Sequence, residues 1–263
     1  MIRLGIVQAP STEDISANLR QIRHFAEEAA SMHCAAVCFP ECSLTGYAPE
    51  NSRKQSVSQM ASELQQTAAI AKEYQLDLLV GFMERCADHC YLTHGIFRAD
   101  GTIDFYRKTH LGQKELRFFQ SGNQLPVFSL SCGLHAGFQM CVETHFPEIT
   151  QTLSLKGADV IFAPHAVPSK AGDRKEIWSK FIPARSYDNR VYMACCNQWD
   201  GNCFGGGCLV TDPKGEEITS CFQDQSALVT FEVDVDLVRK YHDKNAGMRY
   251  RYYPEQRRPE LYV

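Results

Sequence analysis

The sequence lacks several features that would point away from a small-molecule enzyme. It has no hydrophobic run of the roughly 18–20 residues that a membrane-spanning helix needs, and its net charge is −4 with no long basic segment. It therefore gives no indication of binding to membranes or to nucleic acid. It also has no Pro-, Gly- or Ser-rich linker, internal repeat or low-complexity segment, which predicts one domain over residues 1–263. Residues 1–10 are typical of a buried strand rather than a signal peptide, so we expect a soluble cytoplasmic protein.

Cysteine, in contrast, is abundant, with 12 residues. In a chain of this size without an export signal, disulfide bonds are not expected. Cys34, Cys38 and Cys42 are four residues apart, whereas zinc sites usually have closer pairs such as C-x2-C. We interpret these cysteines as small buried hydrophobic residues and predict no metal site and no cofactor. A redox or metal-binding protein is kept as an alternative.

The hydrophobic pattern alternates between the periods of strands and helices. Of the 263 residues, 44% are hydrophobic, enough for one large α/β domain. Strands are predicted at 2–8, 35–39, 76–82, 91–97, 103–107, 135–140, 160–163 and 191–197, from 209, and in two later segments ending near 235. Helices are predicted from 15 to 29 with Thr12 as the candidate N-cap, at 57–71, from about 147, and at 176–189.

Three of these strands end in a reactive side chain. Glu41 follows Phe39-Pro40, Lys108 ends a hairpin strand, and Cys141 stands where an apolar run stops. Each residue alone has an ordinary explanation as a solvated strand end, a surface cation or a packed thiol. Together they supply a proton acceptor, a positive charge for an oxyanion and a nucleophile, which are the parts needed for acyl transfer by cysteine. The pattern predicts a cysteine-dependent acyl-transfer site if the three strand ends are adjacent.

The motifs around these residues resemble the nitrilase superfamily of carbon–nitrogen hydrolases. Glu41 lies in F-P-E-x-x-x-T-G-Y, Lys108 in Y-R-K-x-H-L and Cys141 in G-x-x-x-C-x-E-x-x-F-P-E. The opening G-I-V-Q-A, the segment P-A-R-S-Y-D-N and the closing R-R-P-E-L-Y are also similar to that family. Any one motif is weak, but the set covers nearly the full chain in the family's order.

The resemblance implies a four-layer α-β-β-α sandwich of α/β class and a Glu-Lys-Cys triad of Glu41, Lys108 and Cys141. It also implies that Glu115 supports the triad and that no cofactor is needed. The implied reaction is hydrolysis of a C–N bond in a small amide or N-carbamoyl amine through a cysteine thioester. Family members generally form homodimers or larger homo-oligomers, so the tail at residues 248–263 is expected at a subunit interface.

Substrate choice is expected from loops at the same end of the sheets. The candidate substrate-binding residues are Tyr47, Val142 through its backbone N–H, Glu143, His145 and His165. Arg174 and Lys175 are either carboxylate-binding residues or members of a charged loop. Val142 stands where nitrile-cleaving members usually have tryptophan, which disfavours nitrile hydrolysis. Thr144 and His145 stand where members acting on N-carbamoyl amino acids tend to have arginine. A catalytically idle binding or scaffold member is the remaining alternative.

Overall fold

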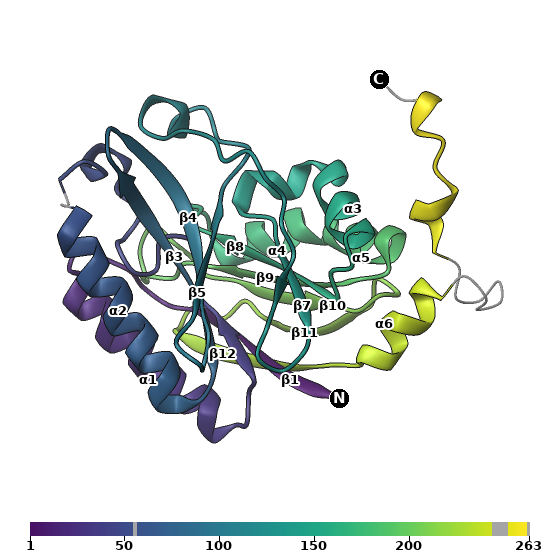
Figure 1. The fold of residues 1–263 in the computed structure, drawn as a ribbon, viewed down its shortest axis with the longest axis horizontal. Helices are drawn as coiled ribbons and strands as arrows, with labels where there is room; N and C mark the ends of the chain where they lie inside the picture. Colours follow the sequence, from purple (N-terminus) through teal and green to yellow (C-terminus); the bar gives the residue numbers. More distant parts are fainter. Residues whose placement is uncertain (55–56, 244–251, 262–263) are drawn as a thin grey trace.

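Two six-stranded sheets form the centre of the molecule, as seen in a computed structural model (Figure 1) that describes residues 1–54, 57–243 and 252–261. The strand order is β12-β1-β2-β3-β4-β5 in the first sheet and β11-β10-β9-β8-β7-β6 in the second. The strands of the first sheet are β1 (Ile2–Gln8), β2 (Ala36–Cys38), β3 (Asp77–Cys86), β4 (His89–Phe97), β5 (Ile103–Arg107) and β12 (Ala227–Val233). Those of the second are β6 (Phe128–Ser129), β7 (His135–Phe138), β8 (Val160–His165), β9 (Tyr192–Asn197), β10 (Cys208–Thr211) and β11 (Glu217–Cys221).

Each sheet has a parallel centre and antiparallel edges. Strands β1, β2 and β3 are parallel neighbours, as are β7, β8 and β9. Strands β4 and β5 form the predicted hairpin, with Phe97 opposite Ile103 and Thr93 opposite Arg107. The parallel strands are buried over most of their length because they are covered on both faces.

The four layers are sheet against sheet, with helices on both outer faces (Figure 1). Helices α1 (Ile15–Ser31) and α2 (Val57–Tyr74) pack on the first sheet. Helices α3 (Pro147–Leu155), α4 (Ala171–Ser179) and α5 (Ile182–Asn189) cover the second. The central core lies between the sheets and includes Leu4, Ile6, Leu79, Phe138, Phe162 and Val210. The predicted α-β-β-α sandwich is confirmed.

Two details of the helices differ from the sequence predictions. Asp14, not Thr12, is the N-cap of α1, because its side chain accepts a hydrogen bond from Ala17 N at 3.1 Å. The single helix predicted at 176–189 is two helices, α4 and α5, separated after Ser179. Pro183 lies in the first turn of α5, where its missing N–H is tolerated, but the same residue inside one long helix would remove a hydrogen bond and clash.

Most of the cysteines interpreted as packing residues are buried. These are Cys34, Cys38, Cys42, Cys90, Cys195 and Cys196, whereas Cys86 is exposed. All of the cysteines are free thiols. Within the three described ranges, no helix is both long and apolar enough to cross a membrane.

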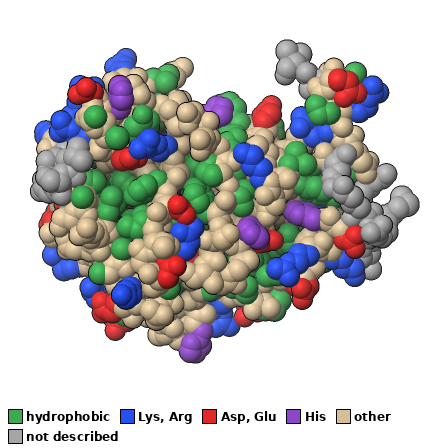
Figure 2. Space-filling model, viewed as in Figure 1, with side chains coloured by type: hydrophobic (Ala, Val, Ile, Leu, Met, Phe, Trp, Pro, Cys, Tyr) green, Lys and Arg blue, Asp and Glu red, His purple; other side chains and the backbone are tan. Residues whose placement is uncertain are grey.

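Most of the described chain after β12 packs on the body of the protein, since Val238 and Tyr241 are buried and the segment Tyr253–Gln256 contacts α3 and α5. Helix α6 (Val235–His242) is followed by two short turns of 3₁₀-helix at Tyr253–Gln256 and Pro259–Leu261. Residues 244–251 and 262–263, which include part of the predicted tail, lie outside the described residues. Figure 1 shows the last described turn, Pro259–Leu261, extending away from the sheets. On the face seen in Figure 2, acidic and basic side chains are intermingled.

Candidate active site

Glu41 lies just beyond the end of β2, in a tightly constrained turn. The backbone at Cys42 has a positive φ of 57°, and the Glu41 carbonyl accepts a hydrogen bond from Gln198 Nε2 at 2.7 Å. A Cβ on Gly81 of β3 would lie 2.5 Å from Cys42 N and 2.9 Å from Pro40 O. Only glycine therefore lets β3 run this close to the turn. The contacts fix a fully buried carboxylate at the end of the sheet.

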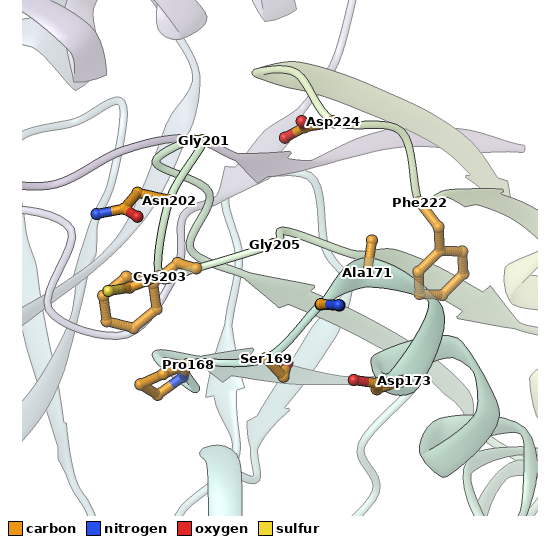
Figure 3. A pocket seen from close by; sticks show the side chains of 12 residues that line it. Pro168, Ser169, Ala171, Asp173, Gly201, Asn202, Cys203, Gly205, Phe222 and Asp224 are labelled. Carbon is orange, nitrogen blue, oxygen red and sulfur yellow. The ribbon is translucent and has the colours of Figure 1, made fainter.

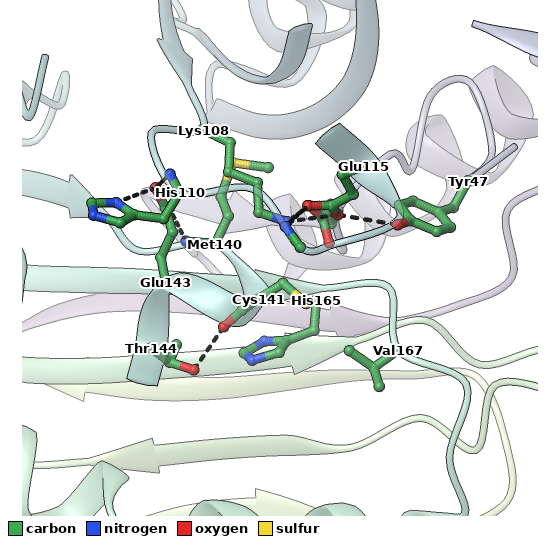
Figure 4. Close-up of polar contacts among 12 residues, drawn as sticks. Tyr47, Lys108, His110, Glu115, Met140, Cys141, Glu143, Thr144, His165 and Val167 are labelled. Atoms are coloured by element: carbon green, nitrogen blue, oxygen red, sulfur yellow. Dashed lines mark hydrogen bonds and ion pairs between the residues drawn. The ribbon is translucent and has the colours of Figure 1, made fainter. Parts of the chain in front are cut away.

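Lys108 brings a positive charge to the same point from the end of β5. Its backbone N–H donates to Leu92 O at 2.8 Å, which continues the pairing of β5 with β4. Its Nζ donates to Glu41 Oε1 at 2.8 Å and to Glu115 Oε1 at 2.9 Å, as Figure 4 shows for Glu115. Burial opposes the charge of Lys108, but the carboxylates outweigh burial and raise its pKa well above the usual value. Lys108 is therefore an ammonium ion between two carboxylates.

Glu115 begins a single turn of 3₁₀-helix, Glu115–Arg117, and is held by three donors. Besides Lys108, Tyr47 OH donates to its Oε1 at 3.0 Å and Gly112 N donates to its Oε2 at 2.6 Å. Tyr47, which we expected at the substrate, is thus bonded to the carboxylate that supports Lys108 (Figure 4). Tyr47 and Glu115 together fix the side of the ammonium remote from Glu41.

The second oxygen of Glu41 has no hydrogen-bond partner among the described residues. Glu41 Oε2 is buried and unbonded in that part of the chain, while Oε1 is bonded to Lys108. Burial raises the pKa of Glu41 to about 7, although the charge of Lys108 opposes the shift. A free carboxylate oxygen with a pKa close to neutral is suited to accept and return a proton.

Cys141 stands on a sharp turn directly after β7 and starts the short 3₁₀-helix Cys141–His145. Its φ is 48°, in the left-handed region that non-glycine residues rarely adopt. Such strain is found where the surrounding structure presents a side chain for function. Cys141 as a residue is partly exposed, and desolvation of its thiol by the surrounding protein raises the pKa to about 12 against the opposing charge of Lys108. Cys141 is therefore a thiol at rest and needs a base to become a nucleophile.

Glu143 is fully buried and joins the segment after β5 to the segment after β7. Its Oε1 accepts from Thr109 N at 2.7 Å, Thr109 Oγ1 at 2.6 Å and His110 N at 3.2 Å. Its Oε2 accepts from Met140 N at 2.7 Å, and Tyr106 OH contacts both oxygens at 2.8 Å. The structure thus places Glu143 inside the protein, bonded to its own chain, and not on the pocket surface where we expected it. This carboxylate sets the position of Lys108 relative to Cys141.

The two predicted histidines lie on the Cys141 side of the site. His165 ends β8 beside Cys141 (Figure 4), with Nδ1 2.8 Å from Ala163 O and its ring 4.9 Å from that of Trp178. Burial lowers the pKa of His165 to about 3, so its Nδ1–H donates to the carbonyl and the ring is neutral. His145 is exposed, with its ring 4.8 Å from that of Phe181, and partial burial lowers its pKa as well.

Val142 follows the nucleophile and is partly exposed. Within the described residues, its backbone N–H has no acceptor in the protein. A free N–H next to the thiol is suited to bind an oxyanion that forms on a substrate carbonyl.

The structure offers no metal site among the described residues and a cavity whose lining does not include the triad. Among residues 1–54, 57–243 and 252–261, no group of three His, Cys, Asp or Glu side chains is placed to hold a metal ion. Figure 3 shows this cavity, whose lining includes none of Glu41, Lys108, Glu115 and Cys141. Its volume is about 610 Å³. It is lined by residues 168–171, Asp173, residues 201–205, Phe222 and Asp224.

Comparison with known proteins identifies the family. The family model for carbon–nitrogen hydrolases matches residues 3–243. The chain therefore belongs to the carbon–nitrogen hydrolases of the nitrilase superfamily, and the resemblance read from its motifs is confirmed.

Individual relatives are similar over nearly the full chain. A nitrilase from Pyrococcus abyssi is 27% identical over 250 residues, covering 91% of this chain and 92% of the relative. Deaminated glutathione amidase from Bos taurus is 26% identical over 282 residues, covering 98% and 83%. The crystal structure of an amidase from Nesterenkonia sp. superposes with a TM-score of 0.84 at 23% identity, covering 99% of this chain and 94% of that one. A mutant of that amidase has been solved in complex with butyramide.

Proposed function

We propose that the protein hydrolyses the C–N bond of a small amide or N-carbamoyl amine, with Cys141 as nucleophile. The observation that carries the proposal is the unpartnered, buried Glu41 Oε2 in a site that also contains the Lys108 ammonium and a strained cysteine. This set combines a base near neutral pKa, a fixed positive charge and a presented thiol. A catalytically idle scaffold has no need to keep a buried carboxylate oxygen without a partner.

The first half of the reaction forms a thioester. Glu41 Oε2 takes the proton of Cys141, and the thiolate attacks the carbonyl carbon of the amide. An ammonium has three N–H donors, and Glu41 and Glu115 use two of those on Lys108. The third, with the N–H of Val142, stabilises the oxyanion. Glu41 then gives its proton to the leaving nitrogen, the C–N bond breaks, and ammonia or an amine leaves.

The second half releases the acid. Glu41, again ionised, takes a proton from a water molecule, and the resulting hydroxide attacks the thioester carbonyl carbon. The C–S bond breaks, the Cys141 sulfur recovers the proton from Glu41, and a carboxylic acid leaves (a carbamic acid, if the substrate is an N-carbamoyl amine). One water is consumed for each bond cleaved, so no redox partner is involved.

The test is ammonia release from a panel of ω-amides, N-carbamoyl amines, N-carbamoyl amino acids and nitriles. Turnover should be lost in Cys141→Ala and retained in Cys203→Ala, because Cys203 is an exposed thiol outside the triad. Release from nitriles alone would favour the alternative of a nitrile hydrolase. Turnover in Cys141→Ala near that of wild type would refute the proposal.

We also propose that the protein acts in the cytoplasm as a homodimer or larger homo-oligomer, with the tail at the subunit interface. The support is the last described turn of the tail, Pro259–Leu261, which extends from the body, has no buried residue and leaves Leu261 62% exposed. An apolar side chain on an extended segment is typical of a surface that another subunit covers.

A further inference from the structure

Arg174 is a buried cation in the second layer of helices. It lies on α4, where its side chain is only 7% exposed. Its guanidinium carbon lies 5.6 Å from the centre of the Trp178 ring. Its Cγ packs where Gly207 leaves room, since a Cβ there would lie 3.2 Å from it. The stem is thus held on two sides, and the guanidinium has a defined position.

This guanidinium has no acidic partner among the described residues. Its recorded hydrogen bonds are two long contacts of 3.4 Å, from Nε and Nη2 to Ser169 Oγ, and Nη1 donates to no group in the described chain. Arg107, in contrast, is paired with Glu84 through Nε at 2.8 Å and through Nη2. A buried charge without a counterion is strongly unfavourable unless something else completes the site. An anionic ligand is the kind of partner that would complete this site.

Arg174 lies near the active site and is linked to it through Trp178. Trp178, against which the guanidinium lies, contacts the His165 ring, and His165 lies beside Cys141 (Figure 4). The charge of Arg174 also acts on three groups of the site: it partly offsets the burial that raises the pKa of Cys141, and it adds to the burial that lowers the pKa values of His145 and His165. These groups come from two separate segments of the chain, and the charge of Arg174 acts on both.

Four other titratable groups lie near this space. Lys108 is engaged by Glu41 and Glu115. His145 and His165 are neutral near pH 7 because their pKa values are lowered. Arg185 acts on His145, and its buried Nε also has no hydrogen-bond partner among the described residues. Arg174 is the more buried of the two cations and lies against Trp178, and its single positive charge matches one carboxylate.

We propose that Arg174 binds a carboxylate of the substrate, so that the substrate is a short linear amide or N-carbamoyl compound with a carboxylate at the end remote from the scissile bond. The planar guanidinium suits a carboxylate because it offers two parallel N–H donors. This inference rests on the proposed function, because it assigns the substrate class of the same site. Cleavage at Cys141 and recognition at Arg174 are separate steps, so they can be tested separately.

The first experiment compares charged and neutral substrates of similar length. We expect the kcat/KM of wild type to be about 10- to 100-fold higher for succinamate than for butyramide, the range for hydrogen bonds to a charged group. Arg174→Gln should lower this ratio toward one, chiefly through KM, and Arg174→Lys should restore part of it. Lys175→Gln is the matched control, because Lys175 is an exposed cation one residue along the same helix. N-carbamoyl-β-alanine and N-carbamoylglycine, run in parallel, tell an ω-amide site from an N-carbamoyl amino acid site.

The second experiment measures binding without turnover. Succinate should raise the Tm of wild type and of Cys141→Ala but not that of Arg174→Gln, whereas butyramide should not distinguish Arg174→Gln from wild type. A preference ratio near one in wild type, with no Tm shift from succinate, would overturn the carboxylate subsite. Hydrolysis that persists in Cys141→Ala would instead refute the proposed function, while the Tm shifts would still decide the role of Arg174.

Discussion

The charge of Glu115 should set the pH at which the enzyme becomes active. Glu41 and Glu115 accept hydrogen bonds from the same nitrogen, at 2.8 and 2.9 Å, so with tetrahedral donors their bonded oxygens are roughly 5 Å apart. Two unit charges at that distance repel by about 3 kcal/mol at an effective dielectric constant of about 20, which corresponds to about two pKa units. Glu115 is among the groups that raise the pKa of Glu41 to about 7. Glu115→Gln should therefore lower the pKa of Glu41 by about two units.

The pH dependence of kcat/KM measures this shift. Glu41 must be ionised to take the thiol proton, so activity should fall about tenfold for each pH unit below its pKa. Wild type should lose activity below about pH 7, and Glu115→Gln should lose it about two units lower. The maximal rate of Glu115→Gln should also be smaller than that of wild type, because a glutamine cannot accept every hydrogen bond that Gly112, Tyr47 and Lys108 now donate.

A matched control removes a carboxylate that lies far from the base. Glu176 is exposed on α4 and paired with Lys180 at the surface, so Glu176→Gln should leave the acid limb unchanged. The reasoning is wrong if the acid limb of Glu115→Gln stays at the wild-type pH or moves to higher pH.

Three further perturbations follow from the geometry. Gly81→Ala would place a methyl group 2.5 Å from Cys42 N, so we expect loss of activity and a lower Tm by calorimetry, and a wild-type Tm would contradict the fixed turn. Glu143→Gln would replace a buried acceptor of backbone N–H groups and destabilise the fold by about 3 kcal/mol. Urea unfolding measures this change in the free energy of unfolding. A change below about 0.5 kcal/mol would show that the bonds of Glu143 between the segments after β5 and β7 are unimportant. Truncation after Gly247 should lower the mass found by light scattering, because it removes the tail that we propose lies at the interface. An unchanged mass would count against that interface.

The layers of the fold were accessible from the sequence because each strand and helix carries its own periodic pattern. The hairpin of β4 and β5 and the parallel strands β7, β8 and β9 follow from apolar runs bounded by turns. The choice between two nearby N-cap residues and the division of one predicted helix into two were harder to predict. Thr12 and Asp14 are both good N-caps, and the geometry of the turn decides for Asp14. The pattern predicts one helix through Pro183, whereas Pro183 lies in the first turn of a second helix.

The reactive residues were accessible because they end strands and lie in recognisable motifs, but their partners were not. That Tyr47 bonds Glu115, and that Gln198 bonds the backbone of Glu41, depends on contacts between residues far apart in the chain. The only local signal for Gln198 is a polar residue directly after a buried strand. Glu143 was expected at the substrate because it follows the nucleophile by two residues, and its burial is a property of the folded turn.

The role of Arg174 illustrates the same limit. In the sequence it stands beside Lys175 in a charged segment, and the two residues look alike. In the structure Arg174 is buried with no counterion among the described residues, and Lys175 is exposed. The difference arises from the packing of Trp178 and Gly207 around Arg174, which no local pattern predicts.

The central claim is that Cys141 forms a thioester with the acyl part of the substrate. The most direct test is to quench the enzyme in acid during turnover of its best amide, digest it, and locate the acyl group by mass spectrometry. The account predicts an acyl adduct on the peptide that contains Cys141, lost on treatment with hydroxylamine and absent in Glu41→Gln. An adduct on another residue, or rapid turnover with no adduct at all under conditions where thioester hydrolysis is slowed, would contradict it.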